Sequence, residues 1–364
     1  MRDMSIGDMS IESGPTTGWK SSRNSCYLIA LRIAALAVLY LICVNIASAE
    51  FNTWTSIGPK GGPIIALVID PKTPTTLYAW VSGIGLYKSA NGGADWNPVN
   101  NKLRPGLYAT SLAIDPKNPT TLYACMDHDG IFKSSDGGKN WKSVNTGLPK
   151  SPLQVLALVI DSTTPNVLYA GTNHGVFKST NGRESWIAVN TGLTNKTVHA
   201  LAIDPTNHST IYAGVASGVF KSINNGESWS LIRPNQTPYI LSIAVDPVTP
   251  AIVYTGTALN GPFKSTDSGN SWSPMKISSF DSDSGPAVFS FVIDPTAPKT
   301  VYAGTFSGVF KSADGGESWI ALNTGLINTQ VEALVMHPTI PSMLYAIASG
   351  GLFILKDPAQ GGGP

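Results

Sequence analysis

One nine-residue phrase recurs six times along the chain and constrains its fold more than any other feature. It reads KSANGGADW at 88–96, KSSDGGKNW at 133–141, KSTNGRESW at 178–186, KSINNGESW at 221–229, KSTDSGNSW at 264–272 and KSADGGESW at 311–319. Every copy ends in Trp and carries Ser at its second position, Asp or Asn at its fourth, and Gly at its fifth or sixth position or both, with Arg183 at the sixth position of the third copy. Repetition at a fixed period indicates a chain assembled from copies of one structural unit.

Each phrase is one part of a longer unit that holds four short apolar runs. The first run closes on an acid, as in ALVID ending at Asp70 and SLAID ending at Asp115, and successive endings lie 42–48 residues apart. The runs are rich in Val, Ile, Tyr, Phe and Trp and are separated by Pro, Asn, Asp and Gly, which predicts four antiparallel strands. A period of about 44 residues with four strands is typical of a propeller blade.

The count of runs predicts how the ring closes. Seven first runs and seven second runs occur, but the seventh unit ends at GLFILKDP (351–358) without its fourth run. The segment TWTSIG at 53–58 matches the missing run and places Trp54 in register with the repeated Trp. We therefore predict an all-β, seven-bladed β-propeller of four-stranded antiparallel blades, with the last blade closed by an N-terminal strand. First runs that are apolar on both faces require the cover that neighbouring blades provide.

The first 49 residues differ from the rest of the chain. A basic, polar start precedes the apolar run IAALAVLYLICVNI (33–46) and the small residues Ala47-Ser48-Ala49, which is typical of a secretory signal peptide cleaved before Glu50. The alternative is an uncleaved membrane anchor. We expect a signal at 1–49, a propeller at 50–357 and a disordered tail at 358–364. The protein is then secreted or periplasmic, or membrane-anchored if the signal is retained.

Charge and cysteine usage exclude several classes of partner. From Glu50 onward the chain has 20 basic and 20 acidic side chains, once the four basic and three acidic residues upstream are subtracted from totals of 24 and 23. This balance argues against a nucleic acid or an anionic membrane surface as partner. Cys125 is the one cysteine of that segment, so no disulfide forms within it. Because Cys125 lies in a strand pattern, we expect a buried, inert thiol rather than a reactive one.

The repeated phrase resembles the Asp-box, or BNR, repeat of sialidases, sortilin-type receptors, xyloglucanase-type glycosidases and photosystem II assembly factors. The resemblance covers 51–357 and implies a structural turn on the face away from any active site. Three copies carry Asn in place of Asp. Asn can form the same turn, but it cannot replace an acid that is essential for chemistry. The residues expected to build these turns are Ser89, Asn91, Trp96, Ser134, Asp136, Trp141, Ser179, Asn181, Trp186, Ser222, Asn224, Trp229, Ser265, Asp267, Trp272, Ser312, Asp314 and Trp319.

The resemblance also implies enzyme mechanisms that the sequence tests. A sialidase-like site needs three arginines around a carboxylate, but the chain beyond Glu50 has only Arg104, Arg183 and Arg233, and Arg183 lies in a repeated turn. The arginine-rich patch of the assembly factors is likewise missing. A xyloglucanase-like site needs two carboxylates across a glycan cleft. Its candidates are Asp127, Asp129, Asp281, Asp283 and Glu332.

Ligand-binding candidates gather in the loops that join second to third strands and fourth strands to the next blade, which share one face of a propeller. The loops of the first three blades are the richest, whereas those of blades four, six and seven (VASG, TFSG, IASG) are plain. The candidates are Trp80, Arg104, Tyr108, Asp127, His128, Asp129, Asn173, His174 and His199. We expect no catalytic residues, metal or cofactor, and a monomer that binds a protein or glycan as a scaffold or assembly factor. The alternative is a glycoside hydrolase.

Overall fold

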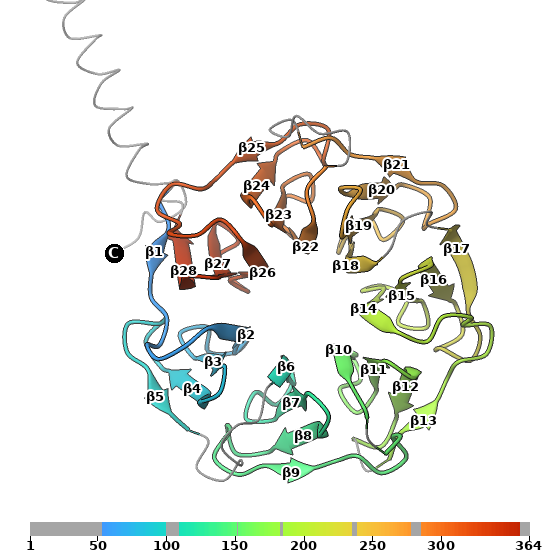
Figure 1. Cartoon of the computed structure of the whole chain (residues 1–364), viewed down its shortest axis with the longest axis horizontal. Helices are drawn as coiled ribbons and strands as arrows, with labels where there is room; N and C mark the ends of the chain where they lie inside the picture. The colour runs from blue at the N-terminus through green and yellow to red at the C-terminus, as the bar shows by residue number, and fades with distance from the viewer. Residues whose placement is uncertain are drawn as a thin grey trace, which may run out of the picture. The chain divides into compact units, whose positions relative to one another are not determined.

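The computed structural model describes residues 53–99, 109–150, 152–182, 185–234, 239–277 and 285–356. These residues form seven four-stranded antiparallel sheets arranged around a central axis (Figure 1). The predicted all-β, seven-bladed propeller is therefore confirmed. The described residues contain no helix that is long and apolar enough to cross a membrane.

Each blade runs outward from the axis in chain order. The inner strands are β2 (Ile64–Ile69), β6 (Ala109–Ile114), β10 (Val155–Ile160), β14 (Val198–Ile203), β18 (Ile240–Val245), β22 (Val288–Ile293) and β26 (Val331–Met336). The second strands are β3 (Leu77–Val81), β7 (Leu122–Met126), β11 (Leu168–Thr172), β15 (Ile211–Val215), β19 (Val253–Thr257), β23 (Val301–Thr305) and β27 (Met343–Ala348). The third strands are β4 (Gly85–Ser89), β8 (Gly130–Ser134), β12 (Gly175–Ser179), β16 (Gly218–Ser222), β20 (Phe263–Ser265), β24 (Gly308–Ser312) and β28 (Gly351–Lys356). The outer strands are β5 (Asn97–Pro98), β9 (Lys142–Ser143), β13 (Ile187–Ala188), β17 (Ser230–Pro234), β21 (Ser273–Pro274), β25 (Ile320–Ala321) and β1 (Thr55–Ser56).

The apolar core lies in the seams between blades. The second strand β3 is buried along its whole length, as are its equivalents β7, β11, β15, β19 and β23. A representative cluster joins Tyr123 and Ile131 of the second blade to Val155 and Leu168 of the third. Since a four-stranded sheet alone would leave one of these faces in water, each blade depends on both neighbours for burial.

The N-terminal strand closes the ring as predicted. Strand β1 pairs with β28, with Thr55 opposite Ile354 and Ser56 opposite Phe353. Trp54 is 2% exposed, and its Nε1 donates a hydrogen bond of 2.6 Å to the carbonyl of Leu322 in the preceding blade. Trp229 makes the equivalent bond to the carbonyl of Val189. Trp54 therefore performs in blade 7 the role that Trp186 and Trp229 perform in blades 3 and 4, and the pairing removes two exposed sheet edges.

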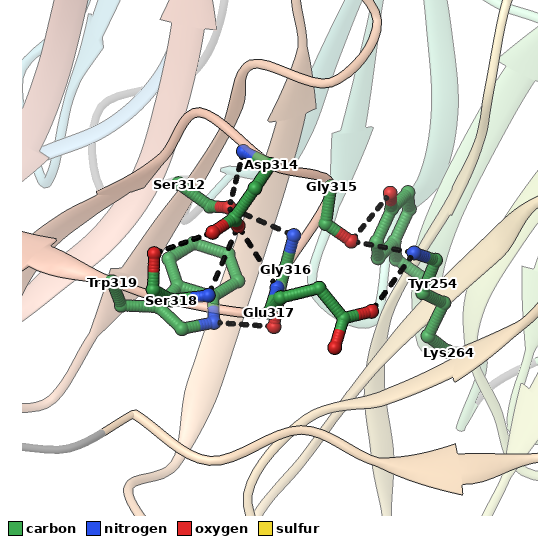
Figure 2. Close-up of polar contacts among 9 residues, drawn as sticks. All are labelled: Tyr254, Lys264, Ser312, Asp314, Gly315, Gly316, Glu317, Ser318 and Trp319. Atoms are coloured by element: carbon green, nitrogen blue, oxygen red, sulfur yellow. Dashed lines mark hydrogen bonds and ion pairs between the residues drawn. The ribbon is translucent and has the colours of Figure 1, made fainter.

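The repeated phrase forms a compact turn between the third and fourth strands, called the box turn below (Figure 2). In blade 6, Ser312 Oγ donates to Asp314 Oδ1 at 2.7 Å and accepts the backbone N–H of Gly316 at 2.7 Å. Asp314 Oδ1 also accepts the backbone N–H of Ser318 at 2.9 Å. Hydrogen bonds such as these lower the pKa of Asp314 below its usual range. The acid of the turn is thus committed to the backbone.

The box turn also joins neighbouring blades. Tyr254 Oη and Lys264 Nζ of blade 5 both donate to the carbonyl of Gly315 in blade 6, at 3.2 and 2.7 Å (Figure 2). The same pair of donors recurs one blade earlier, where Tyr212 and Lys221 bind the carbonyl of Ser268. The box turn therefore contributes hydrogen bonds both within its own blade and to the neighbouring blade.

The single cysteine of the described residues is buried and free. Complete burial raises the pKa of the Cys125 thiol well above its usual value. The thiolate, which is the reactive form, is therefore strongly disfavoured. The expectation of an inert cysteine is confirmed.

Candidate functional site

The two ends of the propeller differ in what they expose. Box turns and the turns from first to second strands lie at one end, called the box face. Loops from second to third strands and from outer strands to the next inner strand lie at the other end, called the loop face. This division follows from the antiparallel strand order of every blade. Loops held by a rigid scaffold are where binding residues concentrate.

Every inner strand carries a β-bulge at its loop-face end. In β14, Val198 pairs with Val215 and Ala200 with Gly214, which leaves His199 outside the register. The same shift occurs in all seven inner strands. A bulge re-aims a side chain, and bulges are frequent beside functional sites. The seven bulged residues, called the channel ring below, are Ile65, Thr110, Leu156, His199, Leu241, Phe289 and Glu332.

The channel ring lines a central cavity of about 400 Å³. Ile65, Leu156, Leu241 and Phe289 make the ring largely apolar. Thr110 is committed to the fold because its hydroxyl donates to the carbonyl of Val155 at 2.5 Å. Glu332 is exposed, and it is the single carboxylate among the described residues that line the cavity. The channel ring therefore combines four apolar side chains with one exposed carboxylate.

His199 is the second ionisable member of the channel ring. Burial lowers the pKa of the His199 imidazole, so this side chain is neutral at pH 7. The imidazole lies edge-to-face against Tyr239 with 5.2 Å between ring centroids. Its buried Nε2 has no hydrogen-bond partner. A neutral imidazole leaves the negative charge of Glu332 uncompensated within the ring.

Four of the predicted site residues come together between blades 2 and 3. Gln154 Nε2 donates to Asp127 Oδ1 at 3.3 Å, and the backbone N–H of Gln154 donates to Asn173 Oδ1 at 2.9 Å. His128 Nε2 lies 3.5 Å from Asp127 Oδ2, and His174 Nε2 lies 3.1 Å from the carbonyl of Pro152. We call these side chains the polar cluster.

The polar cluster does not form a metal centre. No three His, Cys, Asp or Glu side chains of the described segments lie close enough together to hold a metal ion. Asp129 lies in the same loop, where its carbonyl accepts a hydrogen bond of 2.8 Å from Asn145 Nδ2. The cluster therefore offers amide, imidazole and carboxylate groups for hydrogen bonding to a ligand.

The remaining predicted residues lie outside this cluster, and His199 belongs to the channel ring. Trp80 is 1% exposed and packs edge-to-face against Trp141, with ring centroids 6.4 Å apart. This burial corrects the expectation of a surface platform at Trp80, because the strand pattern points its side chain into the seam. Arg104 and Tyr108 lie outside the described residues, as do Asp281 and Asp283.

The loop face also carries exposed apolar side chains that the sequence reasoning overlooked. Ile327 is 79% exposed and Phe306 is 59% exposed, although the loop TFSG had been classed as plain. Five exposed apolar side chains lie on the loops of blades 5, 6, 7 and 1. We call this set the apolar arc: Ile84, Tyr239, Leu259, Phe306 and Ile327. The sequence did contain a signal for these residues, because the loops of other blades carry Ser, Asn or His at such positions. Each of these five side chains is exposed on the loop face.

Comparisons with known proteins support the propeller fold. No protein-family profile and no curated protein sequence matches the chain. Similar solved structures include a GH74 xyloglucanase from Xanthomonas campestris, with a TM-score of 0.67, 18% identity, and coverage of 83% of this chain and 53% of that one. YCF48 from Cyanidioschyzon merolae aligns with a TM-score of 0.64, 15% identity, and coverage of 84% and 99%. YCF48 bound to D1 peptide aligns with a TM-score of 0.65, 14% identity, and coverage of 84% and 96%.

The similar structures differ in chain length. The chain spans about half the length of the GH74 enzymes it resembles. At these identities the likeness shows a shared propeller architecture and leaves function to be argued from the loop face.

Proposed function

We propose that this protein is an exported, non-catalytic propeller of the Asp-box type that binds a peptide segment of another protein at the loop face. The observation that carries the proposal is the channel ring, in which Glu332 is the one charged group at pH 7 beside four apolar side chains. A lysine or arginine side chain matches it, because such a side chain has an aliphatic stem and a cationic end. Export rests on the pattern of residues 1–49, and a monomer remains part of the proposal.

The surroundings of the channel support a protein ligand over a glycan. The apolar arc adds aliphatic contacts from Ile84, Leu259 and Ile327, which suit the apolar side chains of a peptide. The polar cluster on blades 2 and 3 supplies hydrogen-bonding groups on the other side. Interfaces commonly combine an apolar centre with a polar rim. That a propeller of similar fold, YCF48, is known bound to a D1 peptide is consistent with this use of the architecture.

A glycoside hydrolase is the alternative, since the GH74 enzymes share the fold. Hydrolysis requires two carboxylates about 5–9.5 Å apart across the scissile bond. Among the described residues that line the channel, Glu332 has no second carboxylate beside it. The hydrolase therefore depends on acids outside that lining, and the binding proposal does not.

A random peptide display library, panned on the purified protein, tests the proposal. We expect enrichment of peptides that place Lys or Arg beside apolar residues. Glu332→Gln should weaken the selected peptides at least about tenfold, because a charged hydrogen bond is worth about 1.5–3 kcal/mol. Glu317→Gln removes an equal charge from the box face and should leave binding unchanged. Equal binding by wild type and Glu332→Gln would reject the proposal, as would polysaccharide hydrolysis that Glu332→Gln abolishes.

A further inference from the structure

The outer strand of blade 4 departs from its siblings. Strand β17 has five residues, whereas β9, β13 and β25 have two each. In blades 2, 3 and 6 an Asn four residues after the repeated Trp caps the blade's own loop, as Asn190 Oδ1 does by accepting the N–H of Val176 at 2.7 Å. Arg233 occupies this position in blade 4 and pairs with Val219 through its backbone instead. The Arg233 side chain therefore does not cap the loop of its own blade.

Arg233 is a buried cation that has no counter-ion among the residues the structure describes. It is 8% exposed, and its guanidinium carbon lies 3.7 Å from the centroid of the Phe263 ring in blade 5. Its Nη1 is buried without a hydrogen-bond partner. The aspartates in the described parts of blades 4 and 5 lie on the box face. There, Asp204 and Asp246 accept backbone N–H groups of their own turns. No described carboxylate pairs with Arg233.

Further polar groups near Arg233 are also unpaired. Ser217 Oγ is buried without a partner, and Ser217 precedes Gly218, whose pairing partner Pro234 follows Arg233. Thr255 Oγ1 is likewise buried and unpartnered, at a strand position where siblings carry Ala, such as Ala213. Thr255 pairs directly with Phe263, so both side chains lie on the same side of the sheet. Arg233 and Thr255 thus both adjoin Phe263, and Ser217 lies next to Arg233 in the strand pairing of blade 4.

This arrangement has the chemistry of a carboxylate site. A buried charge without a partner is strongly unfavourable, and burial lowers the pKa of Arg233 for the same reason. A guanidinium stacked on an aromatic ring keeps its N–H edge free, and that edge matches a carboxylate in two parallel hydrogen bonds. His199, in the same blade, is neutral at pH 7 because burial lowers its pKa. One positive charge suits a monoanion better than a phosphate dianion.

We propose that the seam between blades 4 and 5 binds a carboxylate group of a ligand, with Arg233 as its charged donor and the Ser217 and Thr255 hydroxyls as further polar groups. The assignment is independent of the peptide-binding proposal, because it concerns a seam between blades rather than the channel ring. A small organic acid or a carboxylate of a peptide has the required chemistry.

Thermal unfolding of the full chain in sodium acetate and in sodium chloride, at pH 7 and equal ionic strength, tests the site. Acetate should raise the Tm of the wild type by about 2–4 °C relative to chloride, as expected for a ligand that binds only the folded state. Arg233→Met keeps an apolar contact with Phe263 but removes the charge. It should lose the response to acetate while remaining at least as stable as the wild type in chloride.

Two controls make the result decisive. Lys139→Met removes an equal charge from an exposed position in a box turn and should respond to acetate as the wild type does. Saturation transfer from the wild-type protein to the acetate methyl group reports binding directly, whether or not Arg233→Met folds. No transfer and no shift in the wild type would overturn the proposal, as would an equal shift in Arg233→Met. A larger Arg233-dependent shift in inorganic phosphate would replace the carboxylate with a phosphate.

Discussion

The box face and the loop face of this propeller are built from the same seven blades, yet they treat their polar groups in opposite ways. On the box face, Asp70 Oδ1 accepts the N–H groups of Lys72 and Thr73 at 2.8 and 3.0 Å, and the corresponding acids of other blades repeat this arrangement. On the loop face, Glu332 is exposed and Arg233 has an unpaired donor. Where the repeat is faithful, polar groups are committed to the fold. Where it diverges, they remain available to a ligand.

Blade 7 extends the comparison because it satisfies the box-face rule with a different residue. His337 stands where its siblings carry Asp, and its Nδ1 accepts the N–H groups of Thr339 and Ile340 at 3.3 and 3.1 Å. Only a neutral imidazole can accept these bonds. The chemistry of the turn is thus retained while its response to pH changes.

The largest effect is expected from removing the closing strand. Deletion of residues 51–60 takes away Trp54 and the pairing of β1 with β28, which exposes the seam between blades 6 and 7. Loss of a buried Trp alone costs about 3–5 kcal/mol, so the Tm should fall by at least about 5 °C. Calorimetry measures the change.

Deletion of residues 359–364 is the matched control for the closing strand, because the sheet of blade 7 ends at Lys356. This deletion should leave the Tm unchanged. A similar small shift for both deletions would show that the ring is not held by its N-terminal strand.

A smaller effect separates the two faces through single serine substitutions. Ser312→Ala leaves the buried N–H of Gly316 without its acceptor, which should cost about 1–3 kcal/mol of unfolding free energy. Ser349→Ala alters an exposed side chain on the loop face and should change stability by less than about 0.5 kcal/mol. Urea unfolding compares the two variants. Equal losses would contradict the division of roles between the faces.

The smallest effect is a pH dependence in blade 7. Burial lowers the pKa of His337 in the folded state, so its stabilising contribution is present above the unfolded pKa of about 6.5 and is lost as pH falls. Between pH 7 and pH 5, the wild type should lose up to about 1 kcal/mol more than His337→Asp, the scale of one hydrogen bond. Urea unfolding at both pH values tests this. Other histidines contribute equally to both proteins, so parallel pH profiles would disprove the role of His337.

The candidate site was less predictable than the fold. The sequence singled out His199 and the loop that carries Asp127 and His128 as candidates, because polar residues there break the repeat, and their role in binding stays a prediction. It misplaced Trp80, since a strand residue can face either a seam or solvent, and the packing of Trp141 against it decides which. Phe306 and Ile327 were overlooked because local composition does not reveal which loop side chains remain uncovered. Seven bulges at matching positions were likewise invisible, since a bulge is defined by strand pairing.

The sequence alone determined the number of blades, the strands within each and the closure by Trp54, because these depend on a local pattern of apolar runs and turns that repeats along the chain. Only the tertiary structure decided that Arg233 lies against Phe263 with no described carboxylate beside it and that Glu332 lines the central channel. Those properties arise from contacts between blades, where each environment is set by residues some 30 to 280 positions away.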